Sequence, residues 1–505
     1  MEFKEFQIPL FSLVFFISII FLYLHNVKKK RSPPFPQTIP ILGNLHLFWK
    51  HSGDFFKSTN YIHDRYGDIV QVKLGFQEFI IVSDVSAARE ILQTRGHHFA
   101  NRPTFKSHEM LMGDRQQSMH LNDWTSNHRM IRKEMMLNLL THYSDEVMEK
   151  FEKASIHTFN NFINSIQVNK MIKKSDLEYF VHTSMIEFIT GKRLQASDER
   201  FAEFIRASER TQSGLSRGQI VDLFPFLAKI SLFQESINKF IPPTVYIREF
   251  ITNDLGQQEV YEKLRYRDPM NDSKPKYFLE HVMKGLVNDS VDVGWEKCFY
   301  VLVSALLGSQ TILSNLLPVL IFLSRDKRIQ EKIFTEISEK FEDDEGDLIK
   351  PSKVKEFLYI QACINETARL IGDPAIPHIS TKNMVIKGFD IPKGSAMLIN
   401  LPRIHRSTKL WNEPEHFRPE RFLQSTADGT MELIKPPNFI PFGLGPRSCP
   451  GYGLHKATCG MVIANLIRKF ILIDRGSNGP SIGPKFDLCI DGEAFRIELM
   501  KRKSY

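Results

Sequence analysis

The chain has 505 residues, of which 42% are hydrophobic and 11% aromatic, so it is long enough to bury a large core. The net charge of +8 allows contact with anionic lipid or an acidic protein, but the sequence shows no zinc finger, basic zipper or RNA-binding signature and requires no nucleic acid. The cysteines are few, odd in number and not in paired metal spacing, which argues against a disulfide framework and indicates a reducing compartment; they are Cys298, Cys363, Cys449, Cys459 and Cys489.

The N-terminus carries an apolar run, residues 8–24, that is near the lower limit for a membrane-spanning helix. The basic block Lys28–Arg31 follows at once, and the positive-inside rule keeps such a block in the cytosol. Acidic residues before the run and the lack of a small-residue cleavage site disfavour a cleaved signal peptide. We therefore predict a single transmembrane helix over residues 1–27, followed by a stiff, basic and proline-rich linker over residues 28–48.

Beyond the linker, two β-rich runs, Ile69–Leu74 and Phe79–Val82, flank Gly75 and predict a hairpin. A helical segment is then predicted to open at Asp123-Trp124, and it carries the basic residues His128, Arg129, Arg132 and Lys133. Residues from about 140 to 290 predict amphipathic helices joined by polar loops.

The stretch Phe299–Leu323 carries no charged residue and is long enough to cross a membrane. The polar cluster Ser309-Gln310-Thr311 lies at its middle, however, and a second span would move the C-terminal part of the chain into an oxidising lumen. We therefore predict one long helix at the centre of a large soluble core.

The C-terminal part predicts a mixture of helices and short strands. Met384–Ile386 and Phe389–Gly394 predict a strand pair. A helix is predicted over Leu454–Leu472, and short strands are predicted over Asp487–Met500.

The loop Pro441–Gly451 has the composition needed to present one cysteine thiolate to an iron. Glycines such as Gly443 allow backbone to approach a flat ligand closely. Arg447, two residues before Cys449, can pair with a ligand carboxylate and favours the thiolate. The helix that starts just behind turns its positive end toward the sulfur. The simpler alternative for any single cysteine is a small, buried, inert side chain.

The pattern Phe-x-x-Gly-x-Arg-x-Cys-x-Gly closely resembles the haem-ligand signature of the cytochrome P450 superfamily, the haem-thiolate monooxygenases, in its microsomal type; it is filled by Phe442, Gly445, Arg447, Cys449 and Gly451. The resemblance extends over nearly the whole chain. It implies a mainly α fold with small β-sheets, in which residues 49–505 form one catalytic domain behind the membrane helix. Haem b would lie against the 299–323 helix, with Cys449 as the axial thiolate of its iron, and the implied contacts from the loop are Phe442, Gly443, Arg447 and Gly451.

The resemblance also implies residues that bind the haem propionates. Relatives carry Trp-x-x-x-Arg in this role, and here Trp124 matches while the fourth position is His128. Either His128 or its neighbour Arg129 replaces the arginine, unless the segment is only a basic, solvated helix face. His378 matches a propionate-binding histidine of many microsomal members, against the alternative of an ordinary core or surface histidine.

At the middle of the long helix, the family carries an acid followed by a threonine, and this pair relays protons to iron-bound dioxygen. Thr311 matches the threonine, but Gln310 stands in place of the acid, and an amide cannot ionise as a carboxylate does. Either Thr311 and water carry the relay, or the chemistry is not ordinary monooxygenation. The remaining alternative is a helix bend filled by satisfied polar groups.

Glu366 and Arg369 are three residues apart, so they share one face of a predicted helix. Such a pair alone is usually a weak surface ion pair. In the family, Glu-x-x-Arg and the arginine of a Pro-Glu-Arg-Phe segment, Arg421 here, form a buried network on the cysteine side of the haem. We predict a structural role for these three residues in holding the cysteine loop.

The implied reaction inserts one atom of dioxygen into a lipophilic substrate, with electrons from NADPH through a membrane-bound NADPH-cytochrome reductase and with cytochrome b5 as an additional donor. The implied location is the endoplasmic reticulum membrane, with the catalytic domain facing the cytosol. Four segments are similar to the Spook/Spookier branch of arthropod ecdysteroid-biosynthesis enzymes, which implies a sterol precursor of moulting hormone; they are Asn101–Phe105, Gly113–Arg115, Asn122–Trp124 and Ile376–Ser380. The alternatives are a haem-thiolate isomerase or dehydratase that uses no dioxygen, and a non-enzymatic membrane haem protein.

Overall fold

The computed structural model describes residues 31–139, 145–195, 197–216, 219–265, 275–288, 294–341, 348–372, 376–476 and 495–502. The predicted membrane helix over residues 1–27, the start of the linker and Cys489 lie outside the described residues.

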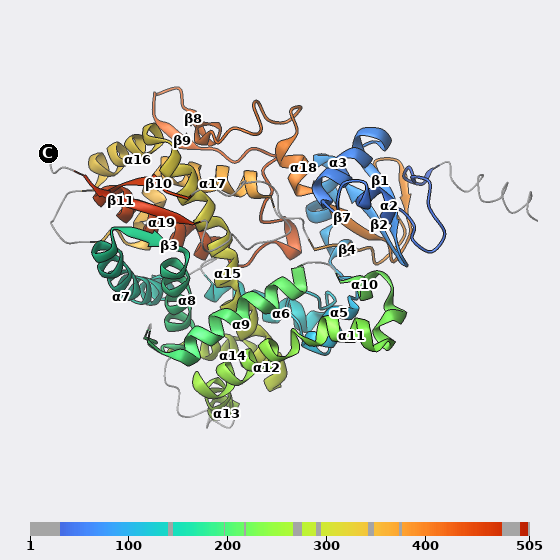
Figure 1. Ribbon diagram of the computed structural model, residues 1–505, viewed down its shortest axis with the longest axis horizontal. Coiled ribbons are helices and arrows are strands. Elements are labelled where there is room, and N and C mark those ends of the chain that lie inside the picture. The colour runs from blue at the N-terminus through green and yellow to red at the C-terminus, as the bar shows by residue number, and fades with distance from the viewer. Residues whose placement is uncertain are drawn as a thin grey trace, which may run out of the picture.

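Helices make up most of the described chain (Figure 1). In order, they are α2 (Leu45–Trp49), α3 (Phe55–Tyr66), α4 (Val85–Arg89), α5 (Lys106–Met112), α6 (Ser126–Asn138), α7 (Asp145–Asn169), α8 (Lys174–Thr190), α9 (Glu199–Ser216), α10 (Ile220–Leu223), α11 (Ser231–Asn238), α12 (Ile241–Glu249), α13 (Gln257–Arg265), α14 (Phe278–Asn288), α15 (Trp295–Arg325), α16 (Lys327–Lys340), α17 (Leu358–Ile371), α18 (Leu401–Arg406) and α19 (Tyr452–Lys469). Short π and 3₁₀ segments are η2 (Glu90–Thr94), η3 (Gly96–Phe99), η4 (Pro225–Lys229), η5 (Phe250–Asp254), η6 (Pro351–Glu356), η7 (Pro419–Phe422) and η8 (Gly445–Arg447).

The strands form small, separate sheets. They are β1 (Ile69–Leu74), β2 (Gln77–Val82), β3 (Met171–Lys173), β4 (His378–Ile379), β5 (Met384–Ile386), β6 (Phe389–Ile391), β7 (Ala396–Ile399), β8 (Leu423–Ser425), β9 (Met431–Leu433), β10 (Phe470–Asp474) and β11 (Arg496–Lys501). The orders are β1-β2-β7-β4, β10-β11-β3, β5-β6 and β8-β9. In the largest sheet β7 pairs parallel with β2, although the two strands are far apart in the sequence. This arrangement confirms the predicted mainly α class with small sheets.

Local sequence signals explain where several elements begin. Asp54, Asp84 and Asp326 precede α3, α4 and α16, and each carboxylate accepts a hydrogen bond from a backbone N–H in the first turn. The predicted hairpin is confirmed as the antiparallel pair β1–β2. Its turn contains Gly75 at φ +61°, a conformation that favours glycine. A Cβ at this position would also lie only 2.5 Å from the carbonyl oxygen of Leu223, so there is no room for a side chain.

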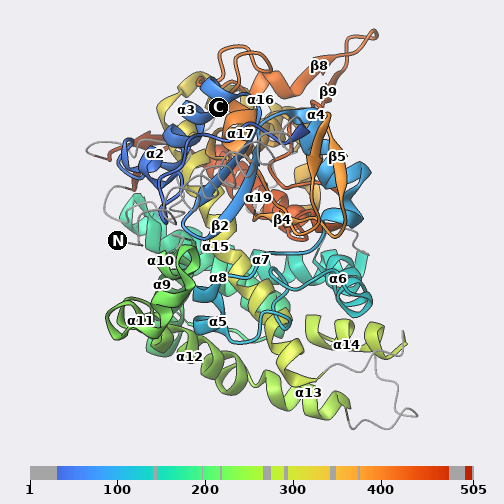
Figure 2. The ribbon, with the colours of Figure 1, turned by 90° about the vertical axis from the view of Figure 1, so that its right-hand side faces the viewer.

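Helix α15 runs through the middle of the molecule in both views (Figures 1 and 2). Within the described chain it is the helix that is long and apolar enough to span a membrane, but 67% of its most apolar window is buried inside the protein. It contacts α8, α17, α19 and β10, and its leucines belong to the main hydrophobic core. The prediction of one central core helix is therefore confirmed. Pro318 lies inside the helix, where the Ser314 hydroxyl donates to the carbonyl of Thr311 at 2.8 Å.

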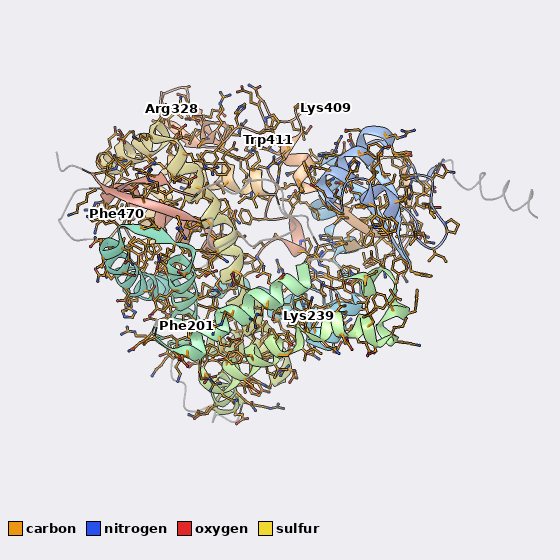
Figure 3. The ribbon with its side chains drawn as sticks, viewed as in Figure 1. Phe201, Lys239, Arg328, Lys409, Trp411 and Phe470 are labelled. Carbon is orange, nitrogen blue, oxygen red and sulfur yellow. The ribbon has the colours of Figure 1, made fainter. Side chains whose placement is uncertain are left out.

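The core divides into a large helical part and smaller parts beside the β1-β2-β7-β4 sheet. Figure 3 shows the side chains filling both regions. Of the residues labelled there, Phe201, Trp411 and Phe470 are buried, whereas the Arg328 side chain on α16 is 88% exposed.

Several predicted boundaries were wrong. Helix α6 begins at Ser126, after Trp124, because the Thr125 hydroxyl caps it by accepting from the N–H of His128. Helix α19 ends at Lys469 rather than Leu472, because the next residues pair with β11 as β10. The predicted strand from Phe389 ends at Ile391. Of the predicted C-terminal strand region, residues 487–494 lie outside the described chain and β11 occupies the rest.

Candidate active site

The loop before α19 is held in one shape by its glycines and by a backbone hydrogen bond. Gly443 and Gly445 have φ values of +67° and +66°, which favour glycine. A Cβ on Gly445 would collide with the carbonyl oxygen of Leu92 in η2, so this loop packs directly on that segment. The N–H of Cys449 donates to the carbonyl of Phe442 at 2.8 Å and closes the loop.

Cys449 lies three residues before α19, and its environment shifts the pKa of its thiol in two directions. Burial raises the pKa of Cys449, while the N–H groups of Gly451 and Tyr452 and the charge of Arg132 lower it. The helix N-terminus adds a positive potential at the same point. A Cβ on Gly451 would lie 3.9 Å from the sulfur, so this glycine borders the thiol directly. Burial outweighs these effects, so the pKa of the free thiol is raised, and binding of a metal ion is what would deprotonate it.

Arg447 joins the cysteine loop to the segments around residues 100 and 122. Its Nε donates to the carbonyl of Ala100 at 2.8 Å, and Nη2 donates to the carbonyl of Asn122. Its Nη1 lies 2.7 Å from Nε2 of His128, and its guanidinium lies over the Trp124 ring at 5.0 Å. An arginine has five N–H donors, so two remain for a ligand carboxylate. Burial lowers the pKa of Arg447 to about 10, and the nearby Arg132 contributes.

The structure separates the two proposed replacements for the arginine after Trp124. Arg129 is exposed, whereas His128 is fully buried and packs edge-on against the Trp124 ring at 5.6 Å. Arg132, one turn later on α6, is also buried and donates to the carbonyl of Ser448, next to the cysteine. The inward positions on this helix are therefore His128 and Arg132, whereas Arg129 lies on the outward face.

Several buried N–H donors gather around these residues without a bonded partner. Because Arg447 can only donate, Nε2 of His128 must accept and its Nδ1 carries the hydrogen. That Nδ1 has no partner among the described residues, and the same holds for Trp124 Nε1, Arg102 Nε and Arg132 Nε. Burial and the neighbouring arginines lower the pKa of Arg102 to about 9 and the pKa of His128 to about 2. Such a concentration of unbonded donors fits a ligand with carboxylate groups, as haem has.

Hydrogen bonds join the segment around His378 to the segment around Arg102. Nδ1 of His378 lies 2.8 Å from the carbonyl of Phe99, which makes Nδ1 the donor and leaves Nε2 to the site. Arg102 donates from Nη1 to the carbonyls of Ile376 and Pro377 at 2.7 and 3.0 Å. Burial holds the pKa of His378 well below its ordinary value, and Arg102 adds to this effect.

On α15, the structure places Thr311 and Gln310 on different faces. Thr311 is exposed, and its hydroxyl donates to the carbonyl of Gly308 at 2.7 Å. A Cβ on Gly308 would meet open space, so the Gly308–Thr311 face is accessible in the middle of an otherwise buried helix. Gln310 points instead toward α8, with Nε2 3.0 Å from Nε2 of His182. The two residues therefore do not form a contiguous pair.

A cavity of about 280 Å³ lies beside α15 and is lined mainly by apolar side chains. Its walls come from α5, α9, α12 and α15 and include Leu111, Met112, Val245, Phe299, Val303 and Leu307. Arg248 and Tyr300 add polar groups to the lining. Leu307 lines the cavity, and Thr311 lies four residues later on the same side of the central helix, so the cavity and the accessible face lie along one side of α15.

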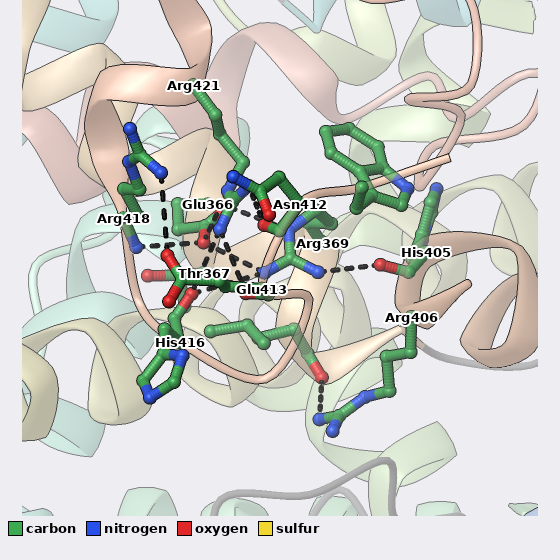
Figure 4. A network of polar contacts seen from close by, with 12 residues as sticks. Glu366, Thr367, Arg369, His405, Arg406, Asn412, Glu413, His416, Arg418 and Arg421 are labelled. Atoms are coloured by element: carbon green, nitrogen blue, oxygen red, sulfur yellow. Dashed lines mark hydrogen bonds and ion pairs between the residues drawn. The ribbon is translucent and has the colours of Figure 1, made fainter. Parts of the chain in front are cut away.

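The structure brings Glu366, Arg369 and Arg421 together as a buried network (Figure 4). Arg369 donates from Nε and Nη2 to the two carboxylate oxygens of Glu366 at 2.7 and 2.8 Å. Arg421 Nε donates to Glu366 at 3.0 Å, and the backbone N–H of Arg418 donates to the same oxygen at 2.9 Å. Arg369 also donates to the carbonyl of His405 at 2.6 Å. Every charge in this set has a partner, which is the condition for burying it.

Comparison with known proteins is consistent with this geometry. The sequence matches the family model described as Cytochrome P450 over residues 33–490. Cytochrome P450 307a1 of Drosophila melanogaster is 24% identical over 511 residues, covering 95% of this chain and 91% of the relative. Indoleacetaldoxime dehydratase of Arabidopsis thaliana is 27% identical over 466 residues, covering 90% and 89%. A zebra fish cytochrome P450 solved with progesterone has a TM-score of 0.70 at 20% identity, covering 88% of this chain and 99% of that one.

The fold, the thiol at the start of α19 and the unbonded donors around it define a protein that holds haem through a cysteine thiolate. The chain belongs to the cytochrome P450 family, so it is a haem-thiolate monooxygenase with the predicted fold. Sequence reasoning placed Arg132 in a basic helical segment and Arg102 in a segment similar to relatives but gave neither a role, and it did not single out His182. The spacing of Arg132 from His128, four residues along one helix, was a usable signal, whereas Arg102 reaches the site only through tertiary contacts.

We expect Arg369→Leu to destabilise the protein strongly, because it leaves the Glu366 carboxylate buried without its bidentate partner. The cost of breaking such a pair is about 3–5 kcal/mol. Arg418→Leu is the matched control, because that side chain is 49% exposed and only its backbone N–H reaches Glu366. Thermal unfolding compares the two, and equal melting temperatures would contradict a special role for the buried network.

We expect Arg132→Leu to weaken haem binding by about tenfold or more, the effect of losing one charge-assisted hydrogen bond in a buried site. Arg129→Leu removes the same charge from the exposed face of the same helix and should retain the wild-type haem content. The ratio of haem absorbance to protein absorbance after purification measures both. Equal haem loss in the two variants would show that only the net charge of α6 matters.

Proposed function

We propose that this protein is a membrane-anchored monooxygenase of the endoplasmic reticulum, that Cys449 is the axial ligand of its haem iron, and that it oxidises a sterol precursor of moulting hormone. The observation that carries the proposal is the position of Cys449 just before α19, where two backbone N–H groups and Arg132 oppose the effect of burial on the pKa of its thiol. When bound, haem supplies the activation of dioxygen and the transfer of one oxygen atom to the substrate.

Residues of the chain stabilise the thiolate, bind the haem propionates and hold the cysteine loop in place. Gly451 and Tyr452 donate N–H groups to the sulfur that favour its negative form against the larger effect of burial. Trp124, His128, Arg102 and Arg132 offer unbonded N–H donors suited to the propionates. The network of Glu366, Arg369 and Arg421 keeps the segment before the cysteine loop in register.

On the α15 side, Thr311 supplies a hydroxyl on the accessible face. Its proton is donated to the carbonyl of Gly308, so its oxygen remains free to accept from water. Thr311 and water then carry protons to the site, which is the first of the two alternatives raised by Gln310.

The sterol substrate is supported by the cavity beside α15, whose lining is mostly apolar with Arg248 and Tyr300 as polar exceptions. The zebra fish protein of the same fold was solved with progesterone, so this fold accommodates a steroid.

Contacts among the segments similar to the Spook/Spookier branch support the ecdysteroid pathway. Asn101 accepts at its side-chain oxygen from the N–H of Trp124 at 2.9 Å, and at its carbonyl from the N–H of Ile379 at 2.9 Å. Arg102 bonds the carbonyl of Ile376. These similar segments therefore form one structural unit around the candidate site rather than scattered matches.

The membrane location is supported by apolar side chains exposed on one side of the molecule, where α2, β2, α10 and α11 lie in both views (Figures 1 and 2). The group comprises Ile41, Trp49, Phe76, Phe226 and Leu232, each more than half exposed. The rings of Phe76 and Phe226 lie 5.8 Å apart, so the hairpin turn and η4 form a continuous apolar surface. This surface adjoins the linker from the predicted anchor.

An electron donor with an acidic face fits the basic group beside the cysteine loop. Lys435 and Lys456 both lie over the Tyr452 ring, at 5.7 and 4.9 Å. Lys456 is partly desolvated there, since burial lowers its pKa to about 8. NADPH-cytochrome reductase, with cytochrome b5 as an additional donor, is the proposed partner.

A dehydratase that uses no dioxygen is the second candidate. Gln310, an amide where the family carries an acid, favours it, and so does the relative named Indoleacetaldoxime dehydratase.

We expect Cys449→Ala to lose the strongly red-shifted Soret band of the reduced, carbon-monoxide-bound protein, because no other thiolate replaces the ligand. Cys449→His is the second variant, and it should keep haem with a histidine-type band. The difference spectrum in membranes measures both. A wild-type band that persists in either variant would mean that another residue binds the iron.

We expect the protein, reductase and NADPH to convert a sterol precursor into a product that carries one atom of labelled dioxygen. A fatty acid of similar carbon number is the control for lipophilicity alone and should be turned over at least about tenfold more slowly. Mass spectrometry measures the label. A product that has lost water, formed without NADPH, would establish the dehydratase instead.

A further inference from the structure

The cavity beside α15 has a polar end, formed by Arg248 of α12 and Tyr300 of α15. The guanidinium of Arg248 lies over the ring of Phe299 at 4.1 Å, and these residues all line the cavity. From this end the lining continues along α15 through apolar residues to Leu307. Tyr300 precedes Thr311 on the helix by about three turns, or roughly 16 Å. A group bound at the polar end is therefore remote from the accessible face of α15, and it serves in recognition.

The charge of Arg248 is balanced within the protein. Its Nη1 and Nη2 donate to the two carboxylate oxygens of Glu296 at 3.0 and 2.9 Å, and its guanidinium also bonds the hydroxyl of Tyr300. Burial lowers the pKa of Arg248, but the bonds to Glu296 outweigh burial and leave the pKa raised. The guanidinium therefore stays charged at neutral pH, and a carboxylate of the protein already matches its charge.

Both groups at the polar end keep hydrogen-bonding capacity for a ligand. An arginine has five N–H donors, and the bonds to Glu296 and Tyr300 take three, so two remain. The Tyr300 hydroxyl donates its hydrogen to the carbonyl of Met112, and its oxygen keeps a lone pair that can accept. Burial raises the pKa of Tyr300, so the phenol stays neutral. Free N–H donors beside a free acceptor are the complement of an alcohol hydroxyl, which both accepts and donates.

We propose that Arg248 and Tyr300, with Glu296 as the counter-charge, select substrates that carry a neutral hydroxyl and reject those that carry a carboxylate. This inference rests on the sterol monooxygenase function proposed above, and it adds the end group by which the substrate is chosen. A hydroxyl accepts from Arg248 and donates to Tyr300 without adding charge. A carboxylate competes with Glu296 for one guanidinium, so two negative groups share a single counter-charge. A ligand without an oxygen at this end leaves the donors of Arg248 without a partner.

Three ligands with the same sterol skeleton isolate the end group. They are cholesterol, the same molecule without its hydroxyl, and the analogue with a carboxylate in place of the hydroxyl. Competition with radiolabelled cholesterol for the holoenzyme, at one fixed detergent concentration, measures all three affinities without turnover. We expect cholesterol to bind the wild type at least about tenfold more tightly than either analogue. Equal affinities would overturn the proposal.

Two substitutions separate the donor from its counter-charge. Arg248→Leu removes the donors and should bring cholesterol and the deoxy analogue to within about threefold of each other. Glu296→Gln leaves the charge of Arg248 unmatched and should tighten binding of the carboxylate analogue about tenfold. Arg200→Leu is the control, because Arg200 pairs with Asp254 at 2.8 Å in another partly exposed ion pair, outside the cavity lining. This control should keep the wild-type order of affinities.

The two substitutions are suited to this test because the side chains of Arg248 and Glu296 are 38% and 55% exposed, so neither change leaves a buried charge unpaired. A wild-type order of affinities in Arg248→Leu would overturn the proposal. An unchanged affinity of Glu296→Gln for the carboxylate analogue, or an altered order in the control, would overturn it as well.

Turnover of the bound sterols with reductase, NADPH and labelled dioxygen distinguishes this inference from the function on which it rests. If the ligands bind in the expected order but no oxygenated product forms, the monooxygenase function fails and the selectivity for a hydroxyl stands. If an oxygenated product forms and the three end groups bind equally, the function stands and the selectivity fails.

Discussion

A negative sulfur must be kept stable in a partly dehydrated position, and much of the molecule is arranged around that constraint. Burial alone raises the pKa of Cys449 and would favour the neutral thiol. Two backbone N–H groups at the start of α19 and the guanidinium of Arg132 act against burial without outweighing it, so the pKa of the free thiol stays raised. Arg447 and Arg132 lower the pKa of Arg102, and Arg132 lowers the pKa of Arg447, so the site accumulates positive charge that an anionic ligand relieves. The same cluster of arginines therefore favours two negative groups, the thiolate and a ligand that bears carboxylates.

The rest of the fold supplies rigidity to that cluster. Arg447 connects the loop to Ala100, Asn122 and His128, which lie in segments far away in the sequence. The buried pair of Glu366 and Arg369 holds the backbone around residues 405, 416 and 418, close before the loop. Neither set contacts the sulfur. Arg447 bonds directly from the loop to those segments, whereas the bonds of the Glu366–Arg369 pair reach the chain that precedes the loop. The polar groups in this protein are therefore concentrated where position matters most, and the remaining interior is apolar.

Sequence reasoning predicted the elements with strong local signals and missed what tertiary contacts decide. Local sequence patterns predicted the long helix over residues 299–323, the glycine-centred hairpin and the loop around Cys449. The end of α19 was wrong because pairing with β11 outweighs helix propensity at Phe470. Arg102 and His182 were missed because nothing local distinguishes them, and their partners lie on remote segments. Gln310 and Thr311 were treated as a pair because the family carries an acid followed by a threonine at these positions, although successive helical residues point about 100° apart.

The strand β7 has a consequence for how the chain can be made. It lies between β2 and β4 and pairs parallel with β2, so the sheet nearest the linker is completed by residues 396–399. A ribosome must therefore synthesise most of the catalytic domain before the β1–β2 hairpin receives its neighbour, and until then one edge of β2 stays open to other chains. During this period the open, apolar edge of β2 beside the linker is a site that a chaperone can bind. Truncated or stalled chains are therefore most prone to aggregate before residues 396–399 have been synthesised. This tendency follows from the order of synthesis and does not depend on how stable the finished protein is.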